Sequence, residues 1–256
     1  MGRLTPAVTR ALDILELFLD RDETLTAPDV VRALELPRTT VHELLATLVA
    51  RGYLVTERTG GYRLGVRLYQ LGSRYAEQLD LAAEGKQVAR NVADKCQETV
   101  HIAILEDTDV IYIAKADSTQ AVRLVSAAGR RLPAHCTAVG KMLLASLTAQ
   151  ELHTRIPDGT RLAAMTANSI TDTATLHTEL AHTRARGTAV EESESNNDAS
   201  CVAAPVRDRT GRVVAALSIS VPGIRWNPER RRELADLAAA GAAELSTRLG
   251  FRRAAT

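Results

Sequence analysis

The order of patterns in residues 1–65 constrains the fold most, because three amphipathic helical segments precede two short strand segments. Apolar residues recur at intervals of three and four over residues 5–20, 27–34 and 38–50, which is the period of a helix with one buried face. Short runs at 53–56 and 62–64, separated by a Gly-containing turn, are typical of a β-hairpin. Three helices followed by a hairpin predict a winged helix-turn-helix.

Beyond residue 65 the pattern becomes a mixture of helices and strands. Residues 66–80 predict a helix that leads out of the small N-terminal domain, and we interpret it as a linker. The rest of the chain predicts an α+β sheet domain. Thr171 and Asn227 are expected to cap two of its helices. The expected strands are 100–105, 110–114, 122–126, 188–191, 202–206 and 213–221, and the further helices include 81–95 and 138–147.

The third helical segment carries the side chains that a DNA-reading helix needs. Such a helix buries an apolar stripe and turns short polar or basic side chains at its N-terminal end toward bases and phosphates. Residues 36–74 hold six arginines against two glutamates, although the net charge of the whole chain is only +1. A merely solvated basic face is the alternative. We expect Arg38, Thr39, Thr40, His42 and Thr47 to enter the major groove, and Arg58 and Arg63 of the hairpin to contact phosphate or the minor groove.

Hydroxyl and thiol side chains indicate a small-molecule site in the second half. Ser218 and Ser220 are two residues apart on an expected strand, so both point to one face of the sheet, and Cys201 begins the strand before it. The backbone amides of Ala138 and Val139 open an apolar helix and would attract an anion. Together these groups favour a small carboxylate with a keto or hydroxyl group. The alternative is structural, with serines bonded to neighbouring backbone and a core thiol.

Histidines in the second half raise the question of a metal site or an enzyme. His101 and His135 accompany Cys201, but no metal-ligand spacing such as His-x-x-x-His appears. Nucleophilic catalysis needs a base and an oxyanion hole, and the sequence identifies neither. The three cysteines form no Cys-x-x-Cys pair and predict reduced thiols. We therefore expect no enzyme activity, no catalytic residue, no metal and no cofactor.

Composition narrows the remaining classes of function. The N-terminus has no apolar segment of the kind found in secretory signals, and the longest apolar stretch, residues 213–224, is too short to span a bilayer. These features predict a cytoplasmic protein without membrane contact. Aromatic residues make up 3% of the chain, too few for the stacking platforms that hold single-stranded nucleic acid. Double-stranded DNA is the nucleic acid that the pattern favours.

Motifs in both halves of the chain carry a family resemblance. In the first half they are Leu36-Pro-Arg-Thr-Thr-Val-His-x-Leu-Leu, Gly52-Tyr-Leu and Tyr62-Arg-Leu-Gly65, and in the second half Gly129-Arg-Arg-Leu-Pro-x-His135, Gly140-Lys141 and Cys201-x-Ala-Ala-Pro-Val206. From about Ala7 to Leu249 the chain resembles the IclR family of bacterial transcriptional regulators. The resemblance implies an α+β protein with an N-terminal winged helix-turn-helix, a linker helix and a C-terminal GAF-like effector-binding domain.

The resemblance also implies how the chain works. Residues 1–65 would bind DNA, 66–80 would form the linker, and 81–256 would bind an effector and form a homodimer or a dimer of dimers. A repressor is expected, which binds a pseudopalindromic operator with an affinity that a small organic carboxylate modulates. The alternative is a sensor module that acts through protein partners without specific DNA binding. The implied effector contacts are Ala138, Val139, Glu191, Cys201, Ser218 and Ser220, with a solvated rim position left open for Glu191.

Two residues depart from the family pattern. Glu43 follows His42 where the family usually has arginine. A carboxylate there would be repelled by phosphate but could accept a hydrogen bond from a cytosine amino group. Glu43 is therefore either a base reader or an inward-turned partner of a nearby arginine. Asp198 stands where the family usually has glycine, so the rim of the effector site is expected to differ.

Overall fold

The structure is a computed structural model that forms two compact units, Met1–Gln78 and Leu79–Thr256, which we call unit 1 and unit 2. The strand expected at 122–126 lies, except for its first residue, outside the described residues. No described helix combines the length and the apolar content needed to cross a bilayer. The structure describes residues 4–19, 24–58, 60–77, 80–122 and 127–252.

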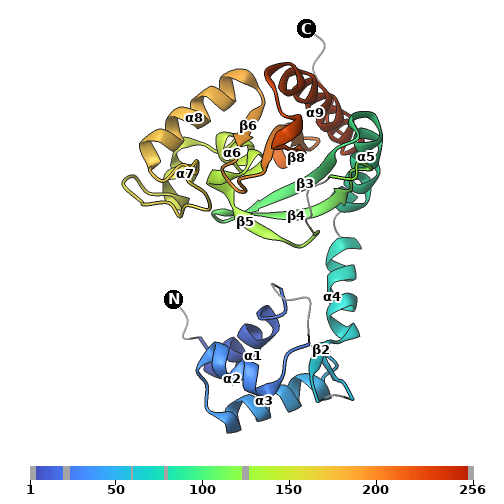
Figure 1. Cartoon of the computed structure of the whole chain (residues 1–256), viewed down its shortest axis with the longest axis vertical. Coiled ribbons are helices and arrows are strands. Elements are labelled where there is room, and N and C mark those ends of the chain that lie inside the picture. The colour runs from blue at the N-terminus through green and yellow to red at the C-terminus, as the bar shows by residue number, and fades with distance from the viewer. Residues whose placement is uncertain (1–3, 20–23, 59, 78–79, 123–126, 253–256) are drawn as a thin grey trace. The chain divides into compact units, whose positions relative to one another are not determined.

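Unit 1 has the predicted order of three helices and a hairpin (Figure 1). The two strands pair antiparallel, with Val55 opposite Arg63. The first helix ends earlier than expected, because the chain turns after Glu16 and buries Phe18 in the core. The elements are α1 (Pro6–Glu16), α2 (Ala27–Leu34), α3 (Arg38–Ala50), β1 (Leu54–Thr56), β2 (Tyr62–Leu64) and α4 (Val66–Glu77).

Two glycines, one before the hairpin of unit 1 and one after it, lie against each other. Gly52 ends α3 with a φ of 76°, in the left-handed region that glycine adopts without strain. Gly65 lies against it so closely that a Cβ at Gly65 would stand 2.2 Å from the backbone O of Gly52. The junction therefore requires glycine at both positions, which fixes the hairpin beside the C-terminal end of α3.

Unit 2 is built on a six-stranded antiparallel sheet in the order β5-β4-β3-β8-β7-β6. Short connections join β3 to β4, β6 to β7 and β7 to β8, a longer one joins β4 to β5, and the central pairing joins strands far apart in sequence, β3 and β8. The sequence did not predict β5, a three-residue strand that contains Pro133. The strands are β3 (Thr99–Glu106), β4 (Asp109–Ala116), β5 (Arg131–Pro133), β6 (Ala189–Glu192), β7 (Ala199–Arg207) and β8 (Val213–Pro222).

Helices cover both faces of this sheet (Figure 1). On one face α5 (Asp80–Cys96) and α9 (Pro228–Arg248) pack side by side, and on the other α6 (Ala138–Ala145) packs with α8 (Thr173–Arg186) behind it. A short helix, α7 (Ala149–Arg155), connects them. The predicted α+β class is confirmed.

Strand alternation divides the core of unit 2 into two clusters. Val202 and Ile219 join the cluster under α5 and α9, whereas Ala203 and Ala216 join the cluster under α6. One predicted helix cap was wrong: α8 is capped by Asp172, not Thr171, because the Asp172 carboxylate accepts the backbone N–H of Thr175 at 2.8 Å.

Candidate functional site

The solvent-facing side of α3 is the candidate DNA-reading surface. Val41, Leu45 and Leu48 are buried in the core of unit 1, which turns the opposite side of the helix outward. That side carries the predicted residues of the helix. Thr40 is half-buried, and Arg38, Thr39, His42, Glu43 and Thr47 are exposed.

The N-terminal end of α3 is open to an anion. Pro37 precedes the helix, and no side chain caps its first turn, so the first backbone N–H groups remain available to an outside acceptor. Arg38 is exposed at that end and, among the residues described, forms no ion pair. An arginine beside open helix amides suits a phosphate group.

Glu43 is exposed on the same surface. None of the arginines that the structure describes lies within ion-pair distance of it, so nothing supports the inward-turned alternative. Thr47 Oγ1 donates to the backbone O of Glu43 at 2.8 Å, which ties the Thr47 hydroxyl back into the helix. The exposed groups at the centre of the surface are thus the Glu43 carboxylate and the His42 ring.

The hairpin contributes two arginines, of which Arg63 forms an ion pair. Arg58 is exposed, whereas Arg63 Nε lies 3.4 Å from Glu57 Oε1. Both partners of this pair are well exposed, at 58% and 36% of the side chain. Exposed ion pairs contribute little stability, so Arg63 can exchange Glu57 for a phosphate at small cost.

In unit 2, polar side chains cross the sheet on the face that α6 covers. Glu191 of β6 is opposite Cys201 of β7, and Cys201 is opposite Ser220 of β8, so all three point to one face. Cys201 Sγ donates to Ser220 Oγ at 3.2 Å. Ser220 Oγ lies 3.4 Å from Nδ1 of His101 on β3. We call Glu191, Cys201, Ser220 and His101 the polar row, and Ser218, opposite His101, faces the same side.

His101 and Tyr112 extend this region but were not predicted as part of it. The rings stack with centroids 4.5 Å apart. Burial lowers the pKa of His101 to about 3, with the charge of Lys115 as the second cause, so the ring is neutral at physiological pH. His101 reaches the row only through the pairing of β3 with β8. No local sequence pattern predicts that His101 lies beside Ser220, because the two residues are far apart in the chain.

Glu191 is fully buried, so the solvated rim position is wrong. Its Oε1 accepts the backbone N–H groups of Glu194, at 2.5 Å, and Ser195, at 3.0 Å. Its Oε2 has no hydrogen-bond partner among the residues described. Burial raises the pKa of Glu191, and the hydrogen bonds from the loop amides oppose that rise.

A buried ion pair holds the loop between β6 and β7 against α6. Lys141 of α6 is 2% exposed, and its Nζ lies 2.5 Å from Glu194 Oε1 and 3.9 Å from Glu179 Oε1. Burial raises the pKa of Glu194, and the ammonium opposes that rise. The loop whose amides donate to Glu191 is therefore held in place by the ion pair of Glu194 with Lys141. The sequence did not predict this role for Lys141 and Glu194.

The first turn of α6 presents two free amides. Thr137 caps the helix, and its Oγ1 accepts only the N–H of Gly140, at 3.0 Å. The amides of Ala138 and Val139 have no backbone acceptor among the described residues. Both residues are buried in the α6 cluster of the core. Free amides above a sheet face that carries hydroxyl, thiol and carboxylate groups suit a small polar anion.

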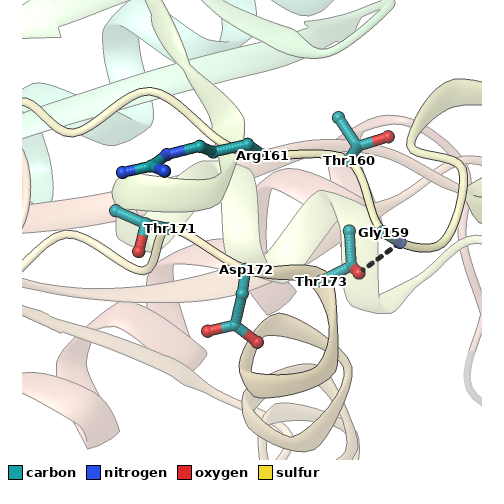
Figure 2. Close-up of a pocket in the computed structure, with 6 residues that line it drawn as sticks. All are labelled: Gly159, Thr160, Arg161, Thr171, Asp172 and Thr173. Atoms are coloured by element: carbon teal, nitrogen blue, oxygen red, sulfur yellow. Dashed lines mark hydrogen bonds between the residues drawn. The ribbon is translucent and has the colours of Figure 1, made fainter.

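Two surface pockets of unit 2 are lined by residues outside the polar row. A pocket of about 240 Å³ is lined in part by Lys141 and Glu194. Another, of about 360 Å³, contains none of the predicted effector residues. Figure 2 shows its lining at the start of α8, with the Gly159 N–H donating to Thr173 Oγ1 at 3.0 Å. Its six lining residues are Gly159, Thr160, Arg161, Thr171, Asp172 and Thr173.

Two family models match the chain in the order of its two units. The model described as IclR helix-turn-helix domain matches residues 7–58. The model described as bacterial transcriptional regulator IclR C-terminal matches residues 73–247, which is more than half of the chain.

Named relatives and solved structures agree with these models. The chain is 34% identical over 215 residues to the HTH-type transcriptional regulator XynR of Escherichia coli, covering 84% of this chain and 85% of XynR. It is 30% identical over 247 residues to the HTH-type transcriptional repressor AllR of Klebsiella pneumoniae, covering 96% and 90%. A solved IclR homolog from Microbacterium hydrocarbonoxydans, complexed with 4-hydroxybenzoate, is 26% identical with a TM-score of 0.83 and coverage of 95% and 98%.

Proposed function

The chain belongs to the IclR family of bacterial transcriptional regulators, and from that premise we propose that it is a repressor with a pseudopalindromic operator and a small carboxylate effector. DNA binding through the helix-turn-helix and effector binding by the C-terminal domain are the properties of the family. The relatives are named as regulators, and the chain is not an enzyme. Because AllR is named a repressor, we extend repression to this chain.

The open N-terminus of α3 carries the DNA-binding part of the proposal. Arg38 and the first amides of the helix bind a phosphate, and the exposed groups further along α3 contact base edges in the major groove. Glu43, exposed and unpaired within the described chain, accepts from a cytosine amino group. The remaining contacts come from Thr39, Thr40, His42 and Thr47 of α3 and from Arg58 and Arg63 of the hairpin.

The effector part of the proposal places a carboxylate at the start of α6. The amides of Ala138 and Val139 are its anion donors, and Ser218 with Glu191, Cys201 and Ser220 of the polar row lies opposite them on the sheet. The homolog complexed with 4-hydroxybenzoate, itself a carboxylate, supports this class of ligand.

An exposed apolar stripe supports self-association. Leu4, two residues before α1, is followed at intervals of four by Val8 and Leu12 of the helix. The exposed fractions of these three residues are 78%, 57% and 52%. A second copy would remove this surface from water. Two winged helices in one dimer would read the two halves of a pseudopalindrome, as a dimer or a dimer of dimers. We keep residues 1–65, 66–80 and 81–256 as the proposed DNA-binding, linker and effector-binding segments.

The substitution Arg38→Ala tests the DNA-binding part. We expect it to weaken operator binding roughly tenfold, because a charge-assisted contact is lost. The slope of log affinity against log salt should fall by about one, because one fewer counterion is released. Fluorescence anisotropy titrations at several salt concentrations measure both quantities.

The control for this substitution is Arg32→Ala. It removes the same charge from α2, where Arg32 Nη1 lies 3.2 Å from Asp29 Oδ1, and should leave affinity and slope unchanged. If Arg38→Ala behaved like Arg32→Ala, α3 would not be the reading helix. Equal, weak binding of operator and scrambled duplex by the unmodified protein would instead indicate a sensor that does not read DNA.

A further inference from the structure

Tyr112 is a buried side chain with an unused hydroxyl. It is 8% exposed, and its ring is held in place by stacking on His101. Within the described part of the chain its Oη forms no hydrogen bond. Burial, followed by the nearby charges of Cys201 and Glu191, raises the pKa of Tyr112 and keeps the group a neutral O–H donor. The Oη is not among the fully buried atoms that lack a partner, so it is accessible as a donor to a bound molecule.

This donor borders the region at the start of α6. Tyr112 packs in the same core cluster as Ala138 and Val139, whose amides are free. The charge of Cys136, two residues before α6, is also close enough to affect the pKa of Tyr112. A phenol and two helix amides are all donors. A carboxylate is the ligand group that suits them, because its two oxygens accept about four hydrogen bonds.

Glu191, in contrast, offers a hydrogen-bond acceptor that needs a donor. Its Oε1 is occupied by the amides of Glu194 and Ser195, and its Oε2 has no partner although the side chain is fully buried. The buried ammonium of Lys141 is already paired with Glu194. When ionised, a carboxylate only accepts hydrogen bonds, so a ligand that pairs with Oε2 of the ionised Glu191 must bring a donor.

We propose that Tyr112 and Glu191 select the effector, with Tyr112 donating to its carboxylate and Glu191 accepting from a second group that carries a proton. The predicted class is a carboxylate with a hydroxyl or ammonium substituent. A keto acid or an unsubstituted acid leaves Glu191 Oε2 unpaired and binds less well. This proposal rests on the proposed effector site, to which it adds Tyr112 and the requirement for a donor.

Matched ligands test the proposal by isothermal titration of the full-length protein. Lactate, alanine and pyruvate share a three-carbon skeleton and offer a hydroxyl, an ammonium or a carbonyl, and 4-hydroxybenzoate differs from benzoate only by a hydroxyl. In each series that binds, the member with a donor should bind about tenfold tighter. Lactate against alanine then shows which donor is preferred.

Two variants test whether Tyr112 and Glu191 cause the preference for a ligand with a donor. Tyr112→Phe should weaken every carboxylate that binds by about tenfold and keep the preference for a donor. Glu191→Gln must keep its carbonyl toward the two loop amides, which places its NH₂ where Oε2 was, so the preference should reverse toward pyruvate. The controls are Tyr69→Phe, on an exposed residue of unit 1, and Glu192→Gln. Glu192 is next along β6 and accepts from Trp226 Nε1. Neither control should change an affinity.

The outcomes separate the two proposals. Pyruvate binding as tightly as lactate and alanine, or Tyr112→Phe leaving all affinities unchanged, overturns the selection by Tyr112 and Glu191 while the carboxylate site stands. Absence of saturable binding by all five compounds overturns the carboxylate effector itself, and the selection with it.

Discussion

Lys141→Met should lower the free energy of unfolding of unit 2 by about 3–5 kcal/mol. The substitution keeps the length of the side chain but removes the ammonium 2.5 Å from Glu194 Oε1. Glu194 then stays buried without a cation, and its second oxygen already lacks a partner among the described residues. Denaturant unfolding followed by fluorescence measures the change, because the single tryptophan, Trp226, lies in unit 2.

The pH dependence of this loss has a definite sign. Burial raises the pKa of Glu194, and Lys141 opposes the rise, so the variant carboxyl should have a still higher pKa. A carboxyl with a raised pKa in the folded state destabilises the fold when charged, so the loss should be largest above that pKa and shrink as the pH falls through it. A loss that grows on acidification would contradict the ion-pair explanation.

Two further variants separate charge from packing. Lys141→Met combined with Glu194→Leu removes both charges, and its loss should be smaller than that of Lys141→Met alone. Arg131→Met breaks an ion pair with Glu106 in which both side chains are about half exposed, and should change stability by less than about 1 kcal/mol. A double variant as destabilised as Lys141→Met alone would show that the loss does not come from leaving the Glu194 charge unpaired.

Gly140→Ala should destabilise unit 2 by about 3 kcal/mol and abolish effector binding. A Cβ at Gly140 would lie 2.1 Å from the backbone O of Ala134, so the start of α6 would have to move. That movement displaces the amides of Ala138 and Val139 from the polar row. The unfolding assay and a carboxylate titration measure the two effects.

Gly223→Ala is the matched control. A Cβ there meets only the backbone O of Asp198, at the ordinary contact distance of 3.8 Å. It should change stability by less than about 0.5 kcal/mol and leave effector binding intact. Should Gly140→Ala prove equally mild, the start of α6 would be more adaptable than the structure indicates, and its amides would not form a rigid anion site.

The fold of unit 1 could be predicted from sequence because its elements are locally encoded. The helical period of α3 and the glycine at its end depend only on neighbours in the chain. In unit 2, β4 alternates between buried and half-buried residues, whereas β3, β7 and β8 are buried over most of their length and stand out as apolar runs. The short strand β5 could not be predicted, because Arg131–Pro133 is three residues long and contains a proline.

The candidate effector site was predictable only where its residues share a strand or a turn. Ser218 and Ser220 share a face because they are two residues apart on β8. His101 and Tyr112 join them through the long-range pairing of β3 with β8, and Lys141 meets Glu194 through tertiary packing. Pairings between distant segments leave no periodic signal, so one sequence does not reveal them.

The most direct test of the proposed regulator measures coupling between its two sites. The full-length protein is titrated with its own upstream DNA, with and without the tightest carboxylate, and then with that carboxylate, with and without the DNA. We expect the carboxylate to weaken operator binding and the operator to weaken carboxylate binding by the same factor; a tenfold change corresponds to about 1.4 kcal/mol. Coupling in one direction only, or no effect of the carboxylate on DNA binding, would contradict an effector-controlled repressor.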